Sequence, residues 1–166
     1  MNIFATDPSP KLSARALDDQ RLVKMVLETA QILCGGLYLR GVPTLALPYK
    51  PTHLGHPAVL WAAMTEENLR WVYRHGWRLS EEYSNRYNKV HKSGEVIEYL
   101  RQYCPSPEIK PRRPQTFYNG ARHKSLGLDY THLPVHEAYR AYLVKRWSMQ
   151  TRPPRWTNSS PPDWRT

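Results

Sequence analysis

The stretch over residues 18–38 constrains the fold most strongly, because its apolar residues recur at helical spacing for several turns. Either Asp18 or Asp19 can cap the start of this helix, and Gly41 with Pro43 stops it. Its apolar face comprises Leu22, Val23, Val26, Ala30, Leu33 and Leu37. A face this broad needs other elements to cover it.

Helical spacing recurs in four further segments. They cover residues 11–17, 57–88, 93–103 and 134–149. Pro57 suits a first helical turn, where its missing N–H would be unpaired in any case, and Gly76 could bend the helix that Pro57 begins. Ser93 is expected to cap the helix at 93–103.

The stretches between these helices are rich in Pro, Gly and polar residues, so we expect loops at 42–56 and 104–129. No useful length of the chain alternates with period two. The sequence therefore predicts an all-α fold, a compact single-domain helical bundle over residues 1–150. A basic Pro/Arg/aromatic loop interrupts it, and a Pro/Trp/Arg-rich tail follows over 151–166.

The balance of charge indicates the kind of partner. The 166 residues include 24 Lys and Arg against 14 Asp and Glu, a formal net charge of +10. Such a surplus repels itself, and a polyanionic partner explains it most simply, nucleic acid before a membrane surface. A merely basic soluble protein is the alternative.

Cysteine usage and hydropathy bear on the compartment. Cys34 and Cys104 are too few for a disulfide framework, and Cys34 lies in an apolar run typical of a core. We see no signal peptide and no apolar run near the ~18 residues of a membrane helix. We therefore expect a cytoplasmic protein without a membrane partner.

Four polar side chains share one face of the helix at 18–38: Arg21, Lys24, Glu28 and Gln31. A solvated face with a Lys–Glu pair would explain them, although Lys before Glu is the less favourable order. A carboxylate flanked by cations is also what glycosidic-bond chemistry on DNA requires. The cations hold phosphates, while the carboxylate moves protons or stabilises positive charge on the sugar.

Two histidines precede the helix at Pro57. His53 and His56 could bind a metal, but no carboxylate or cysteine completes a ligand set, so we expect no metal. His56 is better placed to cap the helix, while Lys50, Thr52 and His53 point at a phosphate near the helix start. A purely structural loop explains this segment equally well.

Cations alternate with aromatic residues over 110–118, which includes Arg112 and Arg113, and again in the C-terminal tail. Cations suit a nucleic-acid backbone and aromatic rings suit bases, so we expect both segments to contact DNA. The second occurrence covers residues 145–147 (KRW) and 152–156 (RPPRW), with Trp147 and Trp156 as their rings. A solvated linker is the alternative, although Trp is unusual in one.

Two short motifs in order carry a family resemblance: residues 13–22 (SARALDDQRL) with Glu28 and Gln31 after them, and residues 55–59 (GHPAV). They resemble the pyrimidine-dimer DNA glycosylase family, the endonuclease V-like enzymes of phages and their bacterial relatives, over roughly residues 1–90. Residues 81–92 resemble small phage proteins related to that group, which adds Arg86 and Lys92 to the expected DNA contacts.

The resemblance implies an all-α monomer without cofactors that acts on damaged or modified pyrimidines in double-stranded DNA. In that family the α-amino group of the chain attacks the sugar C1′, expels the base and forms an imine, and β-elimination then cuts the strand. The essential acid is a glutamate on the first long helix, which corresponds to Glu28. The implied catalytic groups are thus Met1 and Glu28, in a nucleoid-associated protein of a bacterial or phage-infected cell.

The chain departs from the family pattern at two places. A small second residue normally permits removal of Met, whereas Asn2 should hinder it, so the reactive amine would belong to Met1. Arginines that the family places beside its glutamate are replaced by Leu27 and Gln31. Lys24 could compensate as a phosphate contact or as the imine-forming amine, although an α-amine is the better nucleophile at neutral pH.

Two other functions fit the same features. A non-catalytic DNA-binding module would use the basic loop and the aromatic tail without any chemistry at Glu28. An enzyme on the same scaffold could instead modify phage DNA bases, with Glu28 as the acid.

Overall fold

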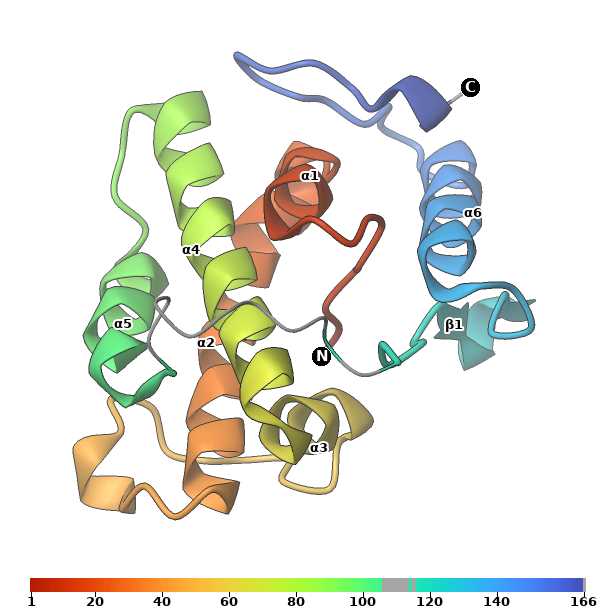
Figure 1. Cartoon of the computed structure of the whole chain (residues 1–166). Coiled ribbons are helices and arrows are strands. Elements are labelled where there is room, and N and C mark those ends of the chain that lie inside the picture. Colours follow the sequence, from red (N-terminus) through yellow and green to blue (C-terminus); the bar gives the residue numbers. More distant parts are fainter. Residues whose placement is uncertain (106–113, 115, 166) are drawn as a thin grey trace.

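The long helix expected at residues 18–38 is the axis on which other helices pack (Figure 1). In the computed structural model, which describes residues 1–105, 114 and 116–165, this helix is α2 (Asp19–Leu39). Three helices lie against it: α3 (Pro57–Met64), α4 (Glu66–Tyr87) and α5 (Lys92–Leu100). The predicted helix and the mostly helical fold are both confirmed.

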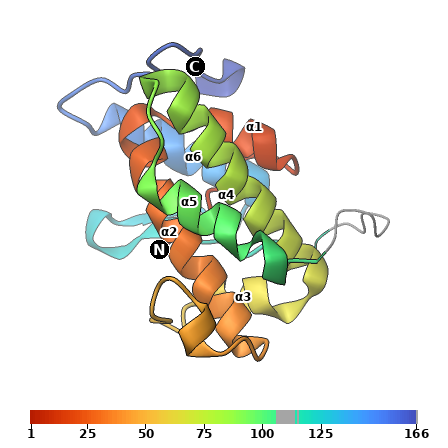
Figure 2. The same cartoon turned by 90° about the vertical axis from the view of Figure 1, so that its left-hand side faces the viewer.

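The remaining elements are short or lie at the two ends of the chain. They are α1 (Pro10–Arg15), α6 (Val135–Ser148), 3-10 turns at Thr44–Ala46, Arg101–Tyr103, Lys124–Leu126 and Asp163–Arg165, and the strands β1 (Arg122–His123) and β2 (Leu128–Asp129). The strands pair antiparallel within the region that we expected to be a loop. Figures 1 and 2 show α5 and α6 at opposite sides of the molecule.

The prediction of one helix over residues 57–88 is wrong. The chain breaks at Thr65, whose backbone is extended and whose side chain accepts a hydrogen bond from the Asn68 N–H, so that Thr65 caps α4. Gly76 does not bend the helix. A Cβ there would lie 2.8 Å from Cγ2 of Thr29, so glycine instead permits the close approach of α4 to α2.

The start of α5 also differs from the prediction. His91, not Ser93, is the cap, and its Nδ1 accepts a hydrogen bond from the Ser93 N–H at 3.1 Å. The Ser93 hydroxyl faces the other way and lies 3.0 Å from the Tyr49 hydroxyl. A histidine cap was harder to recognise in the sequence because serine is the commoner one.

Aromatic rings that we expected to contact DNA are packed inside the protein. Trp147 and Trp156 are buried, with ring centroids 5.1 Å apart. Phe117 stacks on Trp61 at 5.1 Å and meets Trp71 edge-on at 5.0 Å. Burial of such large apolar areas stabilises the fold, so Phe117, Trp147 and Trp156 serve core packing rather than base stacking.

Arg86 is likewise buried rather than free to contact DNA. Its guanidinium donates to the carboxylates of Glu82 at 2.9 Å and Asp19 at 3.0 Å. It also donates to the carbonyls of Leu17 and Arg15. The predicted DNA contact is therefore wrong, because Arg86 joins α4 to the turn between α1 and α2.

By length and composition α2 could cross a membrane, with a mean hydropathy of 1.4, contrary to the expectation that no segment approaches that length. However, 61% of that stretch is buried inside the protein, as in the core helix of a globular domain. Length and composition are therefore weak support for a membrane span here.

We predict that Arg86→Met lowers the free energy of unfolding by about 3 kcal/mol or more, because it leaves the carboxylates of Asp19 and Glu82 without their partner. Urea denaturation measures this change. The exposed Lys89→Met removes the same charge and should shift stability by less than about 0.5 kcal/mol. Equal effects of the two substitutions would contradict the structural role of Arg86.

His75 is a buried histidine that should stay neutral at physiological pH. It is fully buried on α4, and its ring stacks on Trp71 at 4.9 Å. One ring nitrogen, Nδ1, lies 3.3 Å from the Pro10 carbonyl, and the Ile3 backbone also interacts with the ring. Burial lowers the pKa of His75 from 6.5 to about 4.

This pKa predicts a loss of stability in mild acid. The unfolded chain takes up the proton near pH 6.5 and the folded protein only near pH 4, so stability falls as the pH drops through that window. The loss at its lower end is on the order of 3 kcal/mol. Urea denaturation at pH 7 and pH 5 should show a smaller loss in His75→Phe than in the wild type, because His56 and His91, whose pKa values are also lowered, remain in both proteins. An equal slope in both proteins would refute the assignment.

Candidate active site

The first residues of the chain are fixed inside the fold. Ile3 and Ala5 are fully buried. The Asn2 side chain donates to the Gly120 carbonyl at 3.0 Å and accepts from the N–H groups of Ile3 and Phe4. Phe4 has a φ of 40°, so the chain turns sharply there. These contacts place the N-terminus between α2 and the segment that precedes β1.

The Glu28 carboxylate lies beside two amines. The α-amino group of Met1 is 4.0 Å from Oε2, and Nζ of Lys24 is 3.2 Å from Oε1. The backbone N–H of Asn2 donates to Oε2 at 3.0 Å. The side chains of Met1 and Glu28 are 7% and 12% exposed, whereas Lys24 is 72% exposed. The side chain of Met1 is therefore enclosed beside Glu28, whereas the Lys24 side chain extends into solvent.

A cavity of about 310 Å³, here called the N-terminal cavity, opens beside these groups. Its walls are Met1, Asn2, Phe4, Gln20, Arg21, Lys24, Met25, Glu28, Arg122, His123, Tyr142, Arg146 and Gln150. Cations from α2, β1 and α6 converge on this space around a single carboxylate. Such a site favours an anionic ligand and places an acid at its centre.

Arg21 lines this cavity but is also engaged within the protein. Its Nη1 donates to Asp18 at 2.7 Å, and Asp18 in turn accepts from the Trp147 indole at 2.9 Å. With the Gln150 amide oxygen turned towards it, Arg21 also donates to that oxygen. Arg21 therefore has a fixed geometry at the cavity wall.

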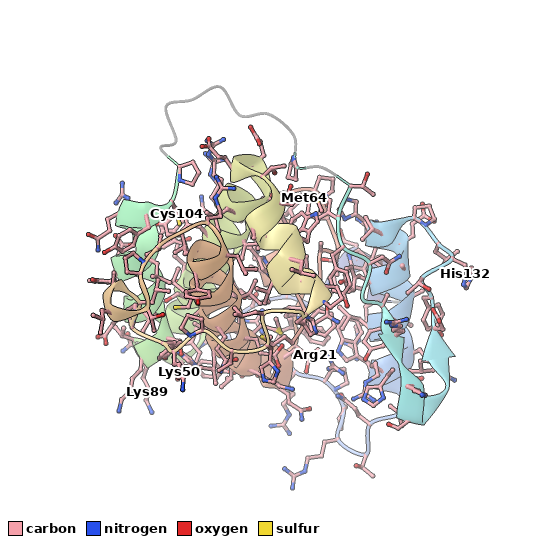
Figure 3. All side chains as sticks on the ribbon, turned by 90° about the horizontal axis from the view of Figure 1, so that it is seen from below. Arg21, Lys50, Met64, Lys89, Cys104 and His132 are labelled. Atoms are coloured by element: carbon pink, nitrogen blue, oxygen red, sulfur yellow. The ribbon has the colours of Figure 1, made fainter. Side chains whose placement is uncertain are left out.

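His56 caps α3 as expected, because its Nδ1 accepts a hydrogen bond from the Ala58 N–H at 3.2 Å. Burial, the nearby N-terminal amino group and His53 lower its pKa, which keeps the ring neutral. His53 and Lys50 are exposed in the preceding loop, and Figure 3 shows Lys50 and Lys89 along one margin of the molecule. His56 lies close enough to the α-amino group for that charge to act on its ring.

The other predicted contacts are scattered. Gln31 is half-buried one turn beyond Glu28, and Lys92 is exposed at the start of α5. Arg112 and Arg113 lie outside the described residues. Within the described ranges, no group of three or more metal-ligating side chains is found.

Several wall residues were missed as parts of one site, including Asn2, Arg146 and Gln150. They come from both ends of the chain, more than 100 positions apart along the sequence. The local motifs stop near residue 90, so no spacing rule could relate these residues to Glu28.

A family model described as pyrimidine dimer DNA glycosylase matches residues 1–94. This range contains both motifs of the resemblance and the Met1, Lys24 and Glu28 side chains. No curated protein and no solved structure matches the chain. The match extends over more than half of the 166 residues, and the chain therefore belongs to the pyrimidine dimer DNA glycosylase family, whose members repair DNA.

Proposed function

We propose that this protein is a DNA glycosylase with AP-lyase activity, with the α-amino group of Met1 as nucleophile and Glu28 as the essential acid. One observation carries the proposal: the α-amine lies 4.0 Å from the Glu28 carboxylate at the wall of a basic cavity. The substrate is a damaged or modified pyrimidine in double-stranded DNA, bound by a protein monomer.

The reaction divides into three steps. The unprotonated amine attacks C1′, the N–C1′ bond forms, and the base leaves with the electron pair of the glycosidic bond and takes up a proton. The attached nitrogen loses a proton, the C1′–O4′ bond breaks, O4′ is protonated and an iminium forms. Removal of a C2′ proton then expels the 3′ phosphate by β-elimination. Glu28 is near enough to the amine to accept protons and to stabilise the positive charge on the sugar.

The cations around the cavity suit the DNA backbone. Lys24 and Arg122 are exposed and Arg146 is half-buried, so all three can meet phosphates on either side of an extruded nucleotide. Arg21, held by Asp18, adds a further positive charge to the wall of the same cavity. The proposal also includes contacts with the DNA backbone by these residues: Gln31, Lys50, His53, His56, Lys92, Arg112 and Arg113.

The choice of Met1 over Lys24 rests on enclosure. The ammonium of Lys24 is ion-paired with Glu28 and projects into solvent, where its long side chain is free to move. The α-amine is held by the Asn2 contacts, so little conformational freedom is lost when it meets the sugar.

Borohydride trapping distinguishes the two amines. The wild type and Lys24→Gln should both form a covalent adduct with DNA that contains an abasic site, because the Met1 amine is intact in each. Acetylation of the α-amino group should abolish the adduct. Peptide mapping of the trapped protein identifies the attached residue, and an adduct on Lys24 would overturn the assignment.

We predict that Glu28→Gln lowers the rate of base excision at least about 100-fold, since proton transfer and charge stabilisation are both lost. Single-turnover kinetics on an ultraviolet-irradiated duplex measure the rate, and binding of the same duplex should stay equal or become tighter. Glu95→Gln removes the same charge from an exposed position and serves as the control. Unchanged excision by Glu28→Gln would favour a non-catalytic DNA-binding module.

A further inference from the structure

Arg70 on α4 is a buried arginine whose charge is not compensated within the described part of the chain. The residue is 4% exposed, and in that part neither Nε nor Nη2 has a hydrogen-bond partner. Arg86, on the same helix and equally buried, donates to two carboxylates and two carbonyls. The contrast shows that the fold can satisfy a buried guanidinium fully, whereas the described residues leave Nε and Nη2 of Arg70 without a partner.

An unpaired guanidinium in the interior is strongly unfavourable. Arginine cannot escape the penalty by losing its proton, because its pKa is too high. A buried charge is normally retained only where it is paired or where it binds something. Arg70 therefore indicates a ligand that supplies negative charge.

Arg70 opens onto a cavity of about 1130 Å³ between α4 and the C-terminal end of α5, here called the Arg70 cavity. Its walls are Arg70, Tyr73, Arg74, Trp77, Glu98, Tyr99, Arg101, Gln102, Cys104 and Pro105. The cavity shares no wall residue with the N-terminal cavity. Figure 2 shows α4 and α5 side by side on the face that carries it.

The charged groups of this cavity favour an anion. Among the described wall residues, Arg70, Arg74 and Arg101 face one carboxylate, Glu98, which pairs with Arg101 at 3.5 Å. Burial, with Glu98 nearby, raises the pKa of Tyr73 to about 12, so its hydroxyl remains a neutral donor.

The Cys104 thiol in the same wall does not act as a nucleophile. Burial raises its pKa to about 12, which leaves essentially no thiolate at neutral pH. The cavity is therefore suited to binding rather than to covalent chemistry.

The cavity also offers aromatic surface. Trp77 and Tyr99 are 38% and 47% exposed. The Arg78 guanidinium lies 4.4 Å from the Trp77 ring centroid, which helps to hold the ring in place. Exposed rings beside cations are what proteins use to stack bases while they hold the phosphates between them.

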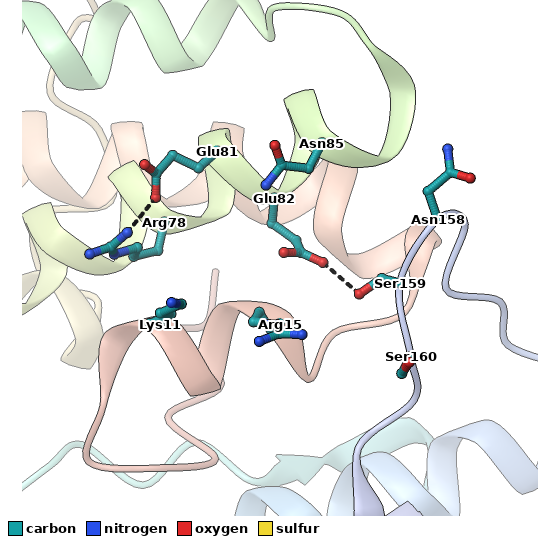
Figure 4. Close-up of a pocket in the computed structure, with 9 residues that line it drawn as sticks. All are labelled: Lys11, Arg15, Arg78, Glu81, Glu82, Asn85, Asn158, Ser159 and Ser160. Carbon is teal, nitrogen blue, oxygen red and sulfur yellow. Dashed lines mark hydrogen bonds and ion pairs between the residues drawn. The ribbon is translucent and has the colours of Figure 1, made fainter.

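The cavity in Figure 4, of about 520 Å³ between α1, α4 and the tail, provides a comparison. There Arg78 pairs with Glu81 at 2.7 Å, and Glu82 accepts from Ser159 at 2.9 Å and from Arg86. Arg78, Glu81 and Glu82 in this cavity are each paired within the protein, unlike the Arg70 guanidinium.

We propose that the Arg70 cavity is a second nucleic-acid site, in which Arg70 binds a backbone phosphate of single-stranded DNA and Trp77 stacks an adjacent unpaired base. The Arg70 cavity, at about 1130 Å³, is larger than a phosphate alone would fill. Only an unpaired base can stack on Trp77 or Tyr99. The proposal rests on DNA as the substrate, as the family implies, and does not depend on the roles proposed for Met1 and Glu28.

The test compares Arg70→Met with Arg152→Met, which removes the same charge from the exposed tail. The probe is a fluorescent oligothymidylate of eight nucleotides without any lesion, titrated by anisotropy at several salt concentrations. Arg70→Met should weaken binding about tenfold and reduce the salt slope by about one, because one phosphate contact is lost. Arg152→Met should keep the wild-type slope.

Two further measurements complete the test. Without DNA, Arg70→Met should unfold at higher urea than the wild type, since an unpaired buried charge has been replaced by an apolar chain. Trp77→Ala, at an exposed position, should weaken oligonucleotide binding even if Arg70→Met fails to fold. Equal affinities of Arg70→Met, Trp77→Ala and Arg152→Met for the oligothymidylate would overturn the proposal.

Adduct formation separates this proposal from the enzymatic one. At saturating abasic duplex, Arg70→Met should be trapped by borohydride as completely as the wild type, since the N-terminal cavity is untouched. Loss of trapping in this variant would contradict the independence of the two sites.

Discussion

Two adjacent aspartates at the start of α2 hold together parts of the chain that are distant in sequence. Asp18 accepts a hydrogen bond from the Trp147 indole of α6, and Asp19 accepts from Arg86 of α4 and from Thr157 of the tail. Burial opposes the charge on Asp19, but the hydrogen bonds from Thr157 and Arg86 outweigh it and lower the pKa of Asp19. The N-terminus of α2 favours both carboxylates. Because α6 supplies one wall of the N-terminal cavity, the shape of that cavity depends on this junction.

The local part of this architecture could be predicted, and the long-range part could not. Periodicity located α2 to within about one residue, and the missing N–H of Pro57 located the start of α3. Periodicity reports which face of a helix is apolar but not where the chain pauses, so the break at Thr65 was missed. The family resemblance directed attention to Glu28, and the structure brings the N-terminal amine to it. Nothing local could relate that pair to Arg146.

Arginine and tryptophan were misread for a common physical reason. A guanidinium or an indole serves equally well against a DNA strand or against another part of the same chain, and composition does not distinguish the two. Trp156 donates to the Ala16 carbonyl and Arg86 neutralises two acids, so both residues are part of the interior. The surplus of positive charge is therefore left mainly to exposed residues. Arg70, buried and unmatched within the described residues, is the exception to this division.

The hydrogen bond between Asn2 and Gly120 has a consequence for the newly made protein. Asn2 and its neighbours reach their final positions only after the segment around Gly120 has been synthesised and packed. Until then the α-amino group of Met1 is not held beside the Glu28 carboxylate, and the cations of the N-terminal cavity do not surround it. A nascent or truncated chain thus carries the terminal amine in an ordinary, unorganised state. The N-terminal cavity therefore forms late, after the C-terminal residues of its wall have been synthesised.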